Sequence, residues 1–325
     1  MDVGEVLVKH EHPITKISKR LLEDLITNRE SRGGRLCIIS GEQGSGKTTM
    51  LRRLAEAFLE QETIVLWRGR TVEQVHWIQD WENRCTFWHW NKDKLTAYDV
   101  RGRATLNMTD ELDVRTYSNP PDLLKNLEEG KINVIYEPST FYFTKSLRLL
   151  DVIRKSAGLK IARKAMNQPH EGELIWFELF YLLVTRMDTY WYAVLLDEAD
   201  DIFPESPQDL RWKLQEWAKN ILRDLRKTRT NLIMCTHALS DIDYRIRSKI
   251  QFWIYMRNAK IPDTSVIKKK ELTFQLKLGQ YIIENGYFGV GWVAPYKMPD
   301  MGDLRIVISP KEEKEEEEKE NVNDR

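Results

Sequence analysis

The chain has 325 residues and a mass of 38.5 kDa, enough for one large α/β domain or two small ones. Hydrophobic residues make up 42% and charged residues 31%, which excludes a disordered chain, and no apolar run reaches the length of about 18 residues that a membrane span needs. The formal charge is zero, but residues 310–325 hold eight acidic and four basic residues, so the rest of the chain carries +4.

The cysteines and the first residues bear on the compartment. Cys37 and Cys235 fall inside apolar runs and are expected to be buried free thiols, and with Cys85 they show no CxxC spacing. This pattern excludes a disulfide framework and favours a reducing, cytoplasmic location. The first twelve residues contain no apolar core and no small-residue cleavage site, so we expect no secretory signal there.

The first 70 residues predict alternating helices and strands. Apolar side chains at helical spacing predict a helix over residues 14–29, which Gly33-Gly34 ends. A short apolar strand at 35–40, an amphipathic helix at 49–61 and a second strand at 63–67 follow. This order is typical of a parallel α/β sheet.

Residues 68–130 predict an aromatic-rich insert. Trp77 and Trp81 are four residues apart and could share a helix face. Strand-like pieces are expected at 98–108 and 111–118, and a helix opened by proline at 120–130. The tryptophans could stack unpaired bases, but packing in the core or between subunits is the favoured interpretation. The insert's four tryptophans are Trp77, Trp81, Trp88 and Trp90.

The remaining elements complete one domain over residues 1–310. Helices are predicted at 145–164, 171–187 and 206–229, and strands at 132–136, 192–196, 232–236 and 250–256. The end is expected to be antiparallel, with strands at 271–278, 280–289 and 303–309 and a hairpin turn at Asn285-Gly286. Residues 311–325 contain a run of charged residues in which no apolar side chain recurs at helical or strand spacing, and this predicts a disordered acidic tail.

A phosphate-binding loop lies between the first strand and the second helix. Residues 41–48, GEQGSGKT, fit the pattern GxxxxGK[ST], in which glycines let backbone N–H groups turn inward and the helix adds its positive end. Lys47 is expected to reach the β- and γ-phosphates of ATP, and Thr48 to offer its hydroxyl to Mg²⁺. The predicted nucleotide-binding set is Gly41, Glu42, Gln43, Gly44, Ser45, Gly46, Lys47, Thr48 and Thr49.

An acidic pair follows the strand at 192–196. Asp197 is expected to hold the metal through water, and Glu198 to polarise the attacking water as the catalytic base. An acidic pair in this place can also cap a helix, with Asp197 accepting from backbone donors. Given the phosphate loop, the catalytic interpretation is favoured.

A polar pair, Thr236-His237, ends the strand at 232–236. Because ligands bind at the carboxyl ends of strands in α/β sheets, either side chain could sense the γ-phosphate or hold the water. The alternative is a loop-start residue bonded to the backbone.

These residues give the chain its family resemblance. It resembles the additional-strand, catalytic-glutamate class of P-loop ATPases with a RecA-like core, and within it the HerA–FtsK superfamily of DNA-pumping motors, including Zot-like virus and plasmid ATPases. The resemblance covers residues 32–58 and 190–258, and the stretch that distinguishes this superfamily from other P-loop ATPases is 221–258. Members usually have Thr-Gln where this chain has Thr236-His237, although imidazole can also donate a hydrogen bond.

The resemblance implies a ring in which an arginine enters the neighbour's active site. Arg226 and Arg229, before the strand at 232–236, are the first candidates, and Arg245 and Arg247 follow. For any single arginine, a solvated helix end or a surface ion pair is the alternative.

Two function classes remain open. The first is a DNA-translocating ATPase serving packaging, transfer or segregation, with DNA and further copies of the chain as partners. The second is a regulatory ATPase that switches a protein partner. A clamp-loader-like ATPase lacks an evident helical lid here. The basic stretches at 145–164 and 268–270 fit a DNA backbone or a solvated face equally well, and a zinc site at His76, Cys85 and His89 is disfavoured because no fourth ligand is suitably spaced.

Overall fold

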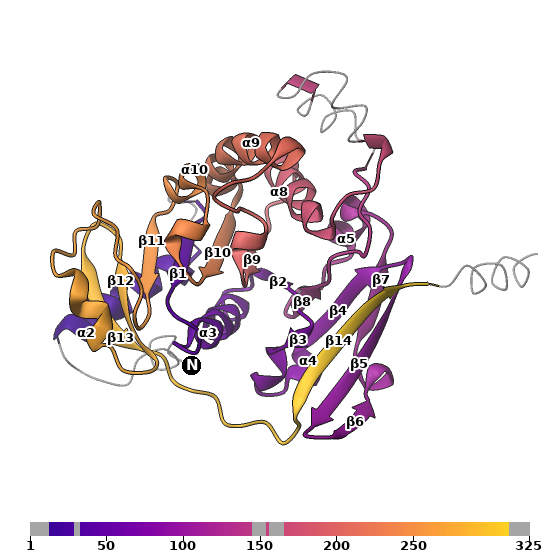
Figure 1. Cartoon of the computed structure of the whole chain (residues 1–325), viewed down its shortest axis with the longest axis horizontal. Coiled ribbons are helices and arrows are strands. Elements are labelled where there is room, and N and C mark those ends of the chain that lie inside the picture. Colours follow the sequence, from indigo (N-terminus) through magenta and orange to yellow (C-terminus); the bar gives the residue numbers. More distant parts are fainter. Residues whose placement is uncertain (1–12, 29–32, 145–153, 156–165, 312–325) are drawn as a thin grey trace, which may run out of the picture.

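The computed structural model describes residues 13–28, 33–144, 154–155 and 166–311, which contain two β-sheets flanked by helices (Figure 1). Apart from residues 154 and 155, the predicted basic helix at 145–164 lies outside the described residues, as does the predicted acidic tail from residue 312 onward. In the described ranges, no helix combines the length and the apolar character that a membrane crossing requires.

The main sheet has ten strands, and eight consecutive strands in it are parallel. Their order across the sheet is β11 (Phe252–Tyr255), β1 (Leu36–Ser40), β10 (Thr230–Thr236), β9 (Tyr192–Leu196), β2 (Ile64–Arg68), β8 (Ile132–Ile135), β4 (Cys85–Trp90) and β7 (Val114–Tyr117). Because β10 lies between β1 and β9, it is the additional strand that the family resemblance implies.

An antiparallel hairpin extends the β11 edge of this sheet. It consists of β12 (Gln280–Glu284), which pairs with β11, and β13 (Phe288–Trp292). The turn between them contains Gly286 at a φ of +73°, so the hairpin turn predicted at Asn285-Gly286 is confirmed. The predicted α/β class, with a mainly parallel sheet and antiparallel C-terminal strands, is likewise confirmed.

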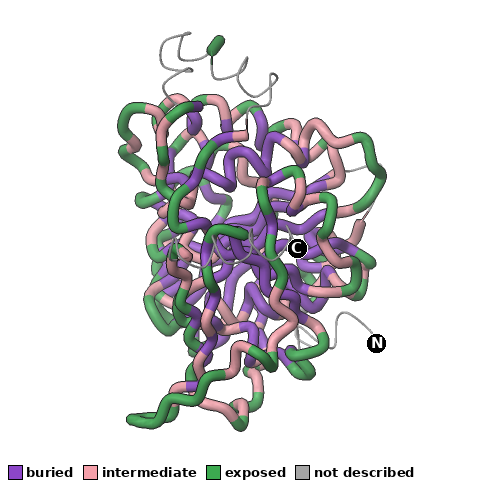
Figure 2. The backbone as a smooth tube through the Cα atoms, turned by 90° about the vertical axis from the view of Figure 1, so that its right-hand side faces the viewer, coloured by how far each residue is buried: buried purple, intermediate pink, exposed green. Residues whose placement is uncertain are grey.

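Helices cover both faces of the sheet, which explains why its strands are apolar throughout. On one face, α8 (Ile175–Thr185) and α9 (Asp209–Leu225) pack against alternate strand residues such as Leu36 and Ile38. On the other, α2 (Pro13–Ile26) and α3 (Lys47–Leu59) pack against the intervening residues Cys37 and Ile39. The buried residues therefore gather in the middle of the molecule (Figure 2). Cys37 and Cys235 are buried and free, as expected, and so is Cys85.

The second sheet is built from the insert and the last strand. Its order is β3 (Val72–Glu73), β14 (Asp303–Pro310), β5 (Asp93–Arg101) and β6 (Ala104–Asn107), with β14 antiparallel to both neighbours. Residues 293–302 connect β13 to β14 across the molecule (Figure 1). The insert thus supplies β4, β7 and α5 (Pro120–Asn126) to the main body and β3, β5 and β6 to the second sheet.

Two sequence-based predictions are wrong in this region. Residues 271–278 do not form a strand: Lys270–Gln275 form a 3₁₀ helix, η7, which the buried Thr273 hydroxyl ties to the chain after β11 by donating to the Ala259 carbonyl at 2.7 Å. Trp77 and Trp81 do not share a helix, because Asp80 takes a left-handed φ of +58° between η1 (Val75–Trp77) and α4 (Trp81–Arg84). Core packing is confirmed for Trp81, Trp88 and Trp90, which are buried.

His76 makes stability depend on pH. Its side chain is 4% exposed, its Nδ1 has no partner among the described residues, and burial lowers its pKa to about 4. The unfolded chain, with a pKa of about 6.5, therefore binds the proton first, and the free energy of unfolding falls as pH drops below about 6.5. At pH 5 this coupling amounts to about 2 kcal/mol. In urea unfolding, His76→Gln is expected to lose that much less stability than the parent between pH 7.5 and 5; equal losses would contradict this.

Candidate nucleotide-binding site

The phosphate loop lies where the sequence predicts it, between the end of β1 and the start of α3. Gly44 and Gly46 have φ values of +72° and +101°, which residues with a side chain rarely adopt, so the loop turns tightly at these two points. At Gly41 a Cβ atom would lie 2.7 Å from both Met256 Cβ and Ser45 Oγ, so the loop also packs closely against the chain after β11.

Lys47 and Thr48 direct their polar atoms toward β10 and β9. Lys47 Nζ donates to the carbonyls of Gly41 (2.8 Å) and Glu42 (3.0 Å) and lies 3.2 Å from His237 Nδ1. The ammonium group is largely buried, and this burial lowers the pKa of Lys47. Thr48 Oγ1 donates to Asp197 Oδ2 at 3.0 Å. A hydroxyl and a carboxylate beside a phosphate loop suit Mg²⁺, which takes few protein ligands.

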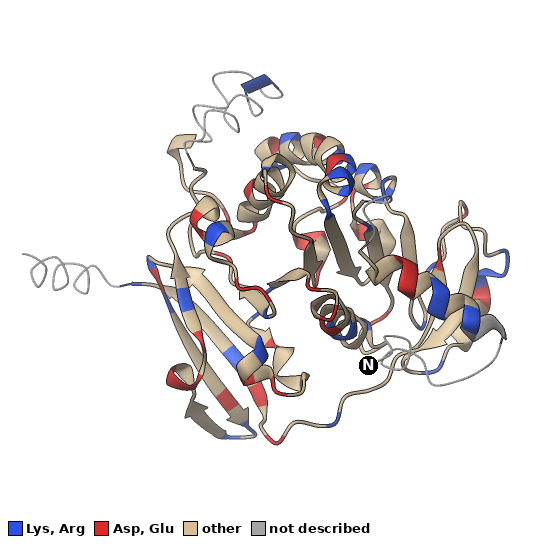
Figure 3. Cartoon of the chain, turned by 180° about the vertical axis from the view of Figure 1, so that it is seen from behind, with Lys and Arg blue, Asp and Glu red and all other residues tan. Residues whose placement is uncertain are grey.

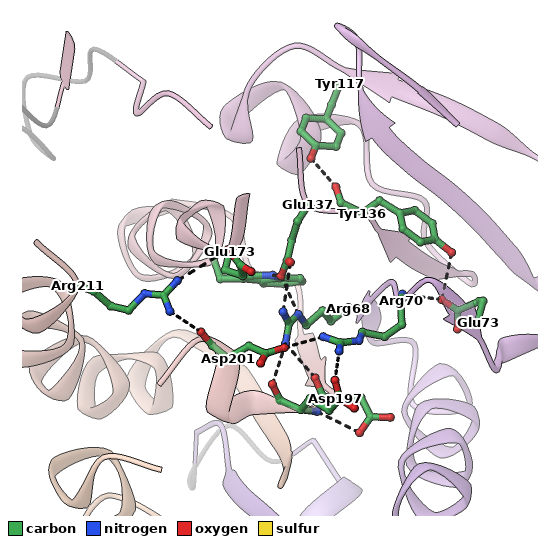
Figure 4. Close-up of polar contacts among 12 residues, drawn as sticks. Arg68, Arg70, Glu73, Tyr117, Tyr136, Glu137, Glu173, Asp197, Asp201 and Arg211 are labelled. Carbon is green, nitrogen blue, oxygen red and sulfur yellow. Dashed lines mark hydrogen bonds and ion pairs between the residues drawn. The ribbon is translucent and has the colours of Figure 1, made fainter. Parts of the chain in front are cut away.

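Asp197 and Glu198 follow β9, as predicted, and Glu198 has a strained φ of +51°. The Glu198 carboxylate forms an ion pair with Arg70, whose guanidinium also lies 2.8 Å from Asp201. In Figure 4 the side chains of Arg68 and Arg70 both reach toward this acidic segment from the end of β2. The ion pair with Arg70 therefore orients the Glu198 carboxylate at the cleft.

Arg68 binds the backbone of the acidic segment, residues 197–201. It is 1% exposed, pairs with Glu137 at 2.7 Å and donates to the backbone carbonyls of Asp197 (3.2 Å) and Glu198 (2.8 Å). Sequence reasoning missed both Arg68 and Arg70. The signal was two arginines directly after a buried strand, a place where basic side chains at the carboxyl edge can face the acidic pair.

The Glu42 side chain makes its hydrogen bonds outside the cleft. Its carboxylate accepts hydrogen bonds from Asn258 and Arg257, both at 2.7 Å, and these contacts, that from Asn258 first, lower the pKa of Glu42. Glu42 therefore ties the phosphate loop to the segment after β11, and only its backbone belongs to the loop's inner surface.

A cleft of about 730 Å³ runs along the phosphate loop. Its walls include most of the predicted nucleotide-binding residues, both acids and His237, whereas Thr236 is buried and its hydroxyl donates to the Ala238 carbonyl at 3.0 Å. Of the polar pair, His237 is thus the one that reaches the cleft. The lining residues are Gln43, Gly44, Gly46, Lys47, Thr48, Thr49, Trp67, Arg70, Thr71, Val72, Glu73, Gln74, Asp197, Glu198, His237, Leu278, Gly279, Trp292, Val293 and Pro295.

Arg226 and Arg229 lie just before β10, at the amino-terminal ends of the parallel strands and therefore opposite the phosphate loop. The Arg226 carbonyl accepts from Gly34 N (2.7 Å), just before β1, and Arg229 Nη1 donates to the Thr189 carbonyl (2.6 Å), before β9. The phosphate loop follows the other end of β1. Neither arginine is therefore brought to its own chain's cleft.

Comparison with known proteins gives one family match and several distant likenesses of fold. Residues 6–86, which contain the phosphate loop, match the family described as Novel STAND NTPase 5. No curated protein sequence matches the chain.

Three solved structures illustrate the likenesses. The genome packaging NTPase B204 of Sulfolobus turreted icosahedral virus 2 is 9% identical, with a TM-score of 0.47 over 82% of this chain and 99% of that one. The pCW3 conjugation coupling protein TcpA is 15% identical, with a TM-score of 0.38 over 84% and 68%. The type VII secretion ATPase EccC of Thermomonospora curvata is 13% identical, with a TM-score of 0.37 over 83% and 24%.

Four observations point to the same fold. They are the phosphate loop between a strand and a helix, the contact between Thr48 and Asp197, the additional strand between β1 and β9, and the family match over residues 6–86. Together they show that the chain has the fold and the phosphate loop of a P-loop NTPase, with an additional strand beside β1.

Proposed function

We propose that the chain is a motor ATPase of the HerA–FtsK type, which hydrolyses ATP and couples hydrolysis to the movement of DNA. One observation supports the ATP-hydrolysis part of this proposal: one cleft is lined by Lys47, Thr48, Asp197 and Glu198, although 151 positions separate the first from the last. A cation for the phosphates, a metal-binding pair and a carboxylate base are the parts that phosphoryl transfer to water requires.

Each side chain has a distinct role in this proposal. Lys47 binds the terminal phosphates, and Thr48 and Asp197 hold Mg²⁺, which when bound neutralises charge on the phosphate oxygens. Glu198 takes the proton of the attacking water. Arg70 pairs with one oxygen of the Glu198 carboxylate, and the other oxygen is the one that takes the proton of the attacking water. His237 follows β10 and lies 3.2 Å from Lys47, and we expect its ring to contact the γ-phosphate.

The DNA half of the proposal depends on the resemblance of residues 221–258 and on exposed lysines. Lys268 and Lys269 are exposed near the β12–β13 hairpin, where Figure 3 shows basic positions interspersed with acidic ones. Lysines on a surface attract a phosphate backbone through a salt-dependent charge interaction.

The test is the rate of ATP hydrolysis with and without duplex DNA. The motor proposal predicts DNA stimulation that weakens with salt and falls in Lys268→Glu/Lys269→Glu. Lys92→Glu/Lys125→Glu, which makes the same charge change at exposed positions on the insert, is expected to keep it. An equal rate with and without DNA at low salt would contradict the motor and favour the alternative, a regulatory ATPase that acts on a protein partner.

We further propose a ring in which Arg226 or Arg229 completes the neighbour's site. The physical reason is that hydrolysis concentrates negative charge on phosphoryl oxygens, and a guanidinium can donate two hydrogen bonds to them. Inactive Lys47→Ala subunits and inactive Arg226→Ala/Arg229→Ala subunits are expected to restore some activity when mixed, since some interfaces then contain a wild-type half from each. Co-assembly without any recovered activity would contradict the trans arginine.

A further inference from the structure

The contacts of the phosphate loop fix the direction in which a nucleotide lies across the cleft. In the sheet, β9 and β10 are on one side of β1, and β11 and β12 are on the other. Lys47 lies 3.2 Å from His237 after β10, and Thr48 lies 3.0 Å from Asp197 after β9. The terminal phosphates therefore belong on the β9–β10 side, and the rest of a nucleotide extends toward β11 and the β12–β13 hairpin.

The two ends of the cleft differ in chemistry. The β9 end carries the charges of Arg70, Asp197 and Glu198, with Lys47 at the loop. Among the described residues, the hairpin end is lined by the uncharged Leu278, Gly279, Trp292 and Val293, whereas Pro295 also borders a second pocket with Glu73 and Gln74. Leu278 is 60% exposed, which leaves an apolar side chain at the mouth of the cleft. This polarity matches a nucleotide, which is highly charged at one end and a flat aromatic base at the other.

Trp292 lies close to the phosphate loop although 245 positions separate it from Lys47. A Cβ atom on Gly46 would come within 3.8 Å of Gly279 Cα, and one on Gly279 would come within 3.2 Å of Trp292 Nε1. The indole, Gly279 and the end of the loop are therefore successive neighbours. Gly279 has a φ of +77° and no side chain, so the indole edge lies directly on the backbone.

The segment after Trp292 is held in place by α3, which begins at the phosphate loop. Val293 N donates to the Gly279 carbonyl at 2.9 Å, and Arg53 Nε donates to the Ala294 carbonyl at 3.2 Å. The Arg53 guanidinium also lies 3.6 Å from the Tyr296 ring centroid. Because these contacts fix the wall before any ligand binds, little ordering is needed on binding.

We propose that the hairpin end of the cleft is the nucleobase subsite, and that Trp292 stacks on the base of the bound nucleotide, with Leu278 covering its open side. This inference depends on the proposed nucleotide-binding function and adds the residue that distinguishes a nucleotide from a bare polyphosphate. Stacking on an indole face favours the larger purine rings and does not depend on a particular hydrogen-bonding edge.

The test compares two ligands, Mg·ATP and Mg·tripolyphosphate, by calorimetry on the full chain. Trp292→Ala is expected to weaken ATP binding roughly 5- to 100-fold, the usual effect of losing a base–aromatic stack, and to leave tripolyphosphate binding unchanged. Trp292→Phe is expected to stay within about threefold of the parent for both ligands. Trp212→Ala, at a partly exposed tryptophan on α9, is the control and is expected to change neither.

Leu278→Asn provides a second variant in case Trp292→Ala does not fold, because Leu278 is largely exposed and its replacement leaves the core intact. It is expected to weaken ATP binding several-fold and to spare tripolyphosphate. Unchanged ATP affinity in both folded variants, or an equal loss for the two ligands, would overturn the base subsite. A parent chain that binds neither ligand would instead contradict nucleotide binding itself.

Discussion

Lys47→Ala is expected to weaken ATP binding by about 100-fold and to abolish measurable hydrolysis. The Lys47 ammonium is held inside the phosphate loop by two carbonyls at 2.8 and 3.0 Å, so its position is set before phosphate arrives. Hydrogen bonds to charged groups contribute about 1.5–3 kcal/mol each, and alanine removes the cation that would make them to the β- and γ-phosphates.

Calorimetry with ATP and a phosphate-release assay measure this effect. Lys125→Ala, at an exposed position on α5, is the control and is expected to behave as the parent. A folded Lys47→Ala protein with the parent's affinity and turnover would rule the site out.

Glu198→Gln is expected to keep ATP binding and to slow hydrolysis by about 10²-fold or more, because the amide has the shape of the carboxylate but cannot accept the proton of water. The fold is expected to tolerate the change. Glu198 is partly exposed, its ion pair with Arg70 contributes little to stability, and Arg68 bonds the backbone carbonyl rather than the side chain.

Single-turnover hydrolysis separates the chemical step from binding in this variant. Glu205→Gln replaces an acid of similar exposure that does not line the cleft, so its rate is expected to match the parent's. Parental turnover in Glu198→Gln would show that another group activates the water.

The core of the fold was predictable from sequence because its signals are local. The apolar runs that became β1, β2, β9 and β10 are each followed by glycine, charge or a polar pair, and the loop at residues 41–48 has a spacing that few other structures use. The strand predicted at 271–278 is wrong although polar and apolar residues alternate strictly there, because contacts with distant residues override the local pattern. Thr273 and Leu276, three positions apart, are buried, whereas Phe274 and Leu278 are exposed.

The parts of the site that sequence reasoning missed depend on contacts between distant positions. Arg70 reaches Glu198 across 128 residues, and Glu42 meets Arg257 across 215. Trp292 borders the loop only because the β12–β13 hairpin is added beside β11. No local period encodes such neighbours, since they follow from strand order, and strand order is a property of the whole sheet.

The most direct test of the central claim, that one cleft holds the phosphate loop, Asp197 and Glu198 as an ATP-hydrolysing centre, is steady-state phosphate release from ATP. The account predicts release that requires Mg²⁺, stops when the metal is chelated and is lost in Lys47→Ala. Release that persists under chelation, or no release from the folded parent chain with Mg²⁺ and DNA present, would contradict it.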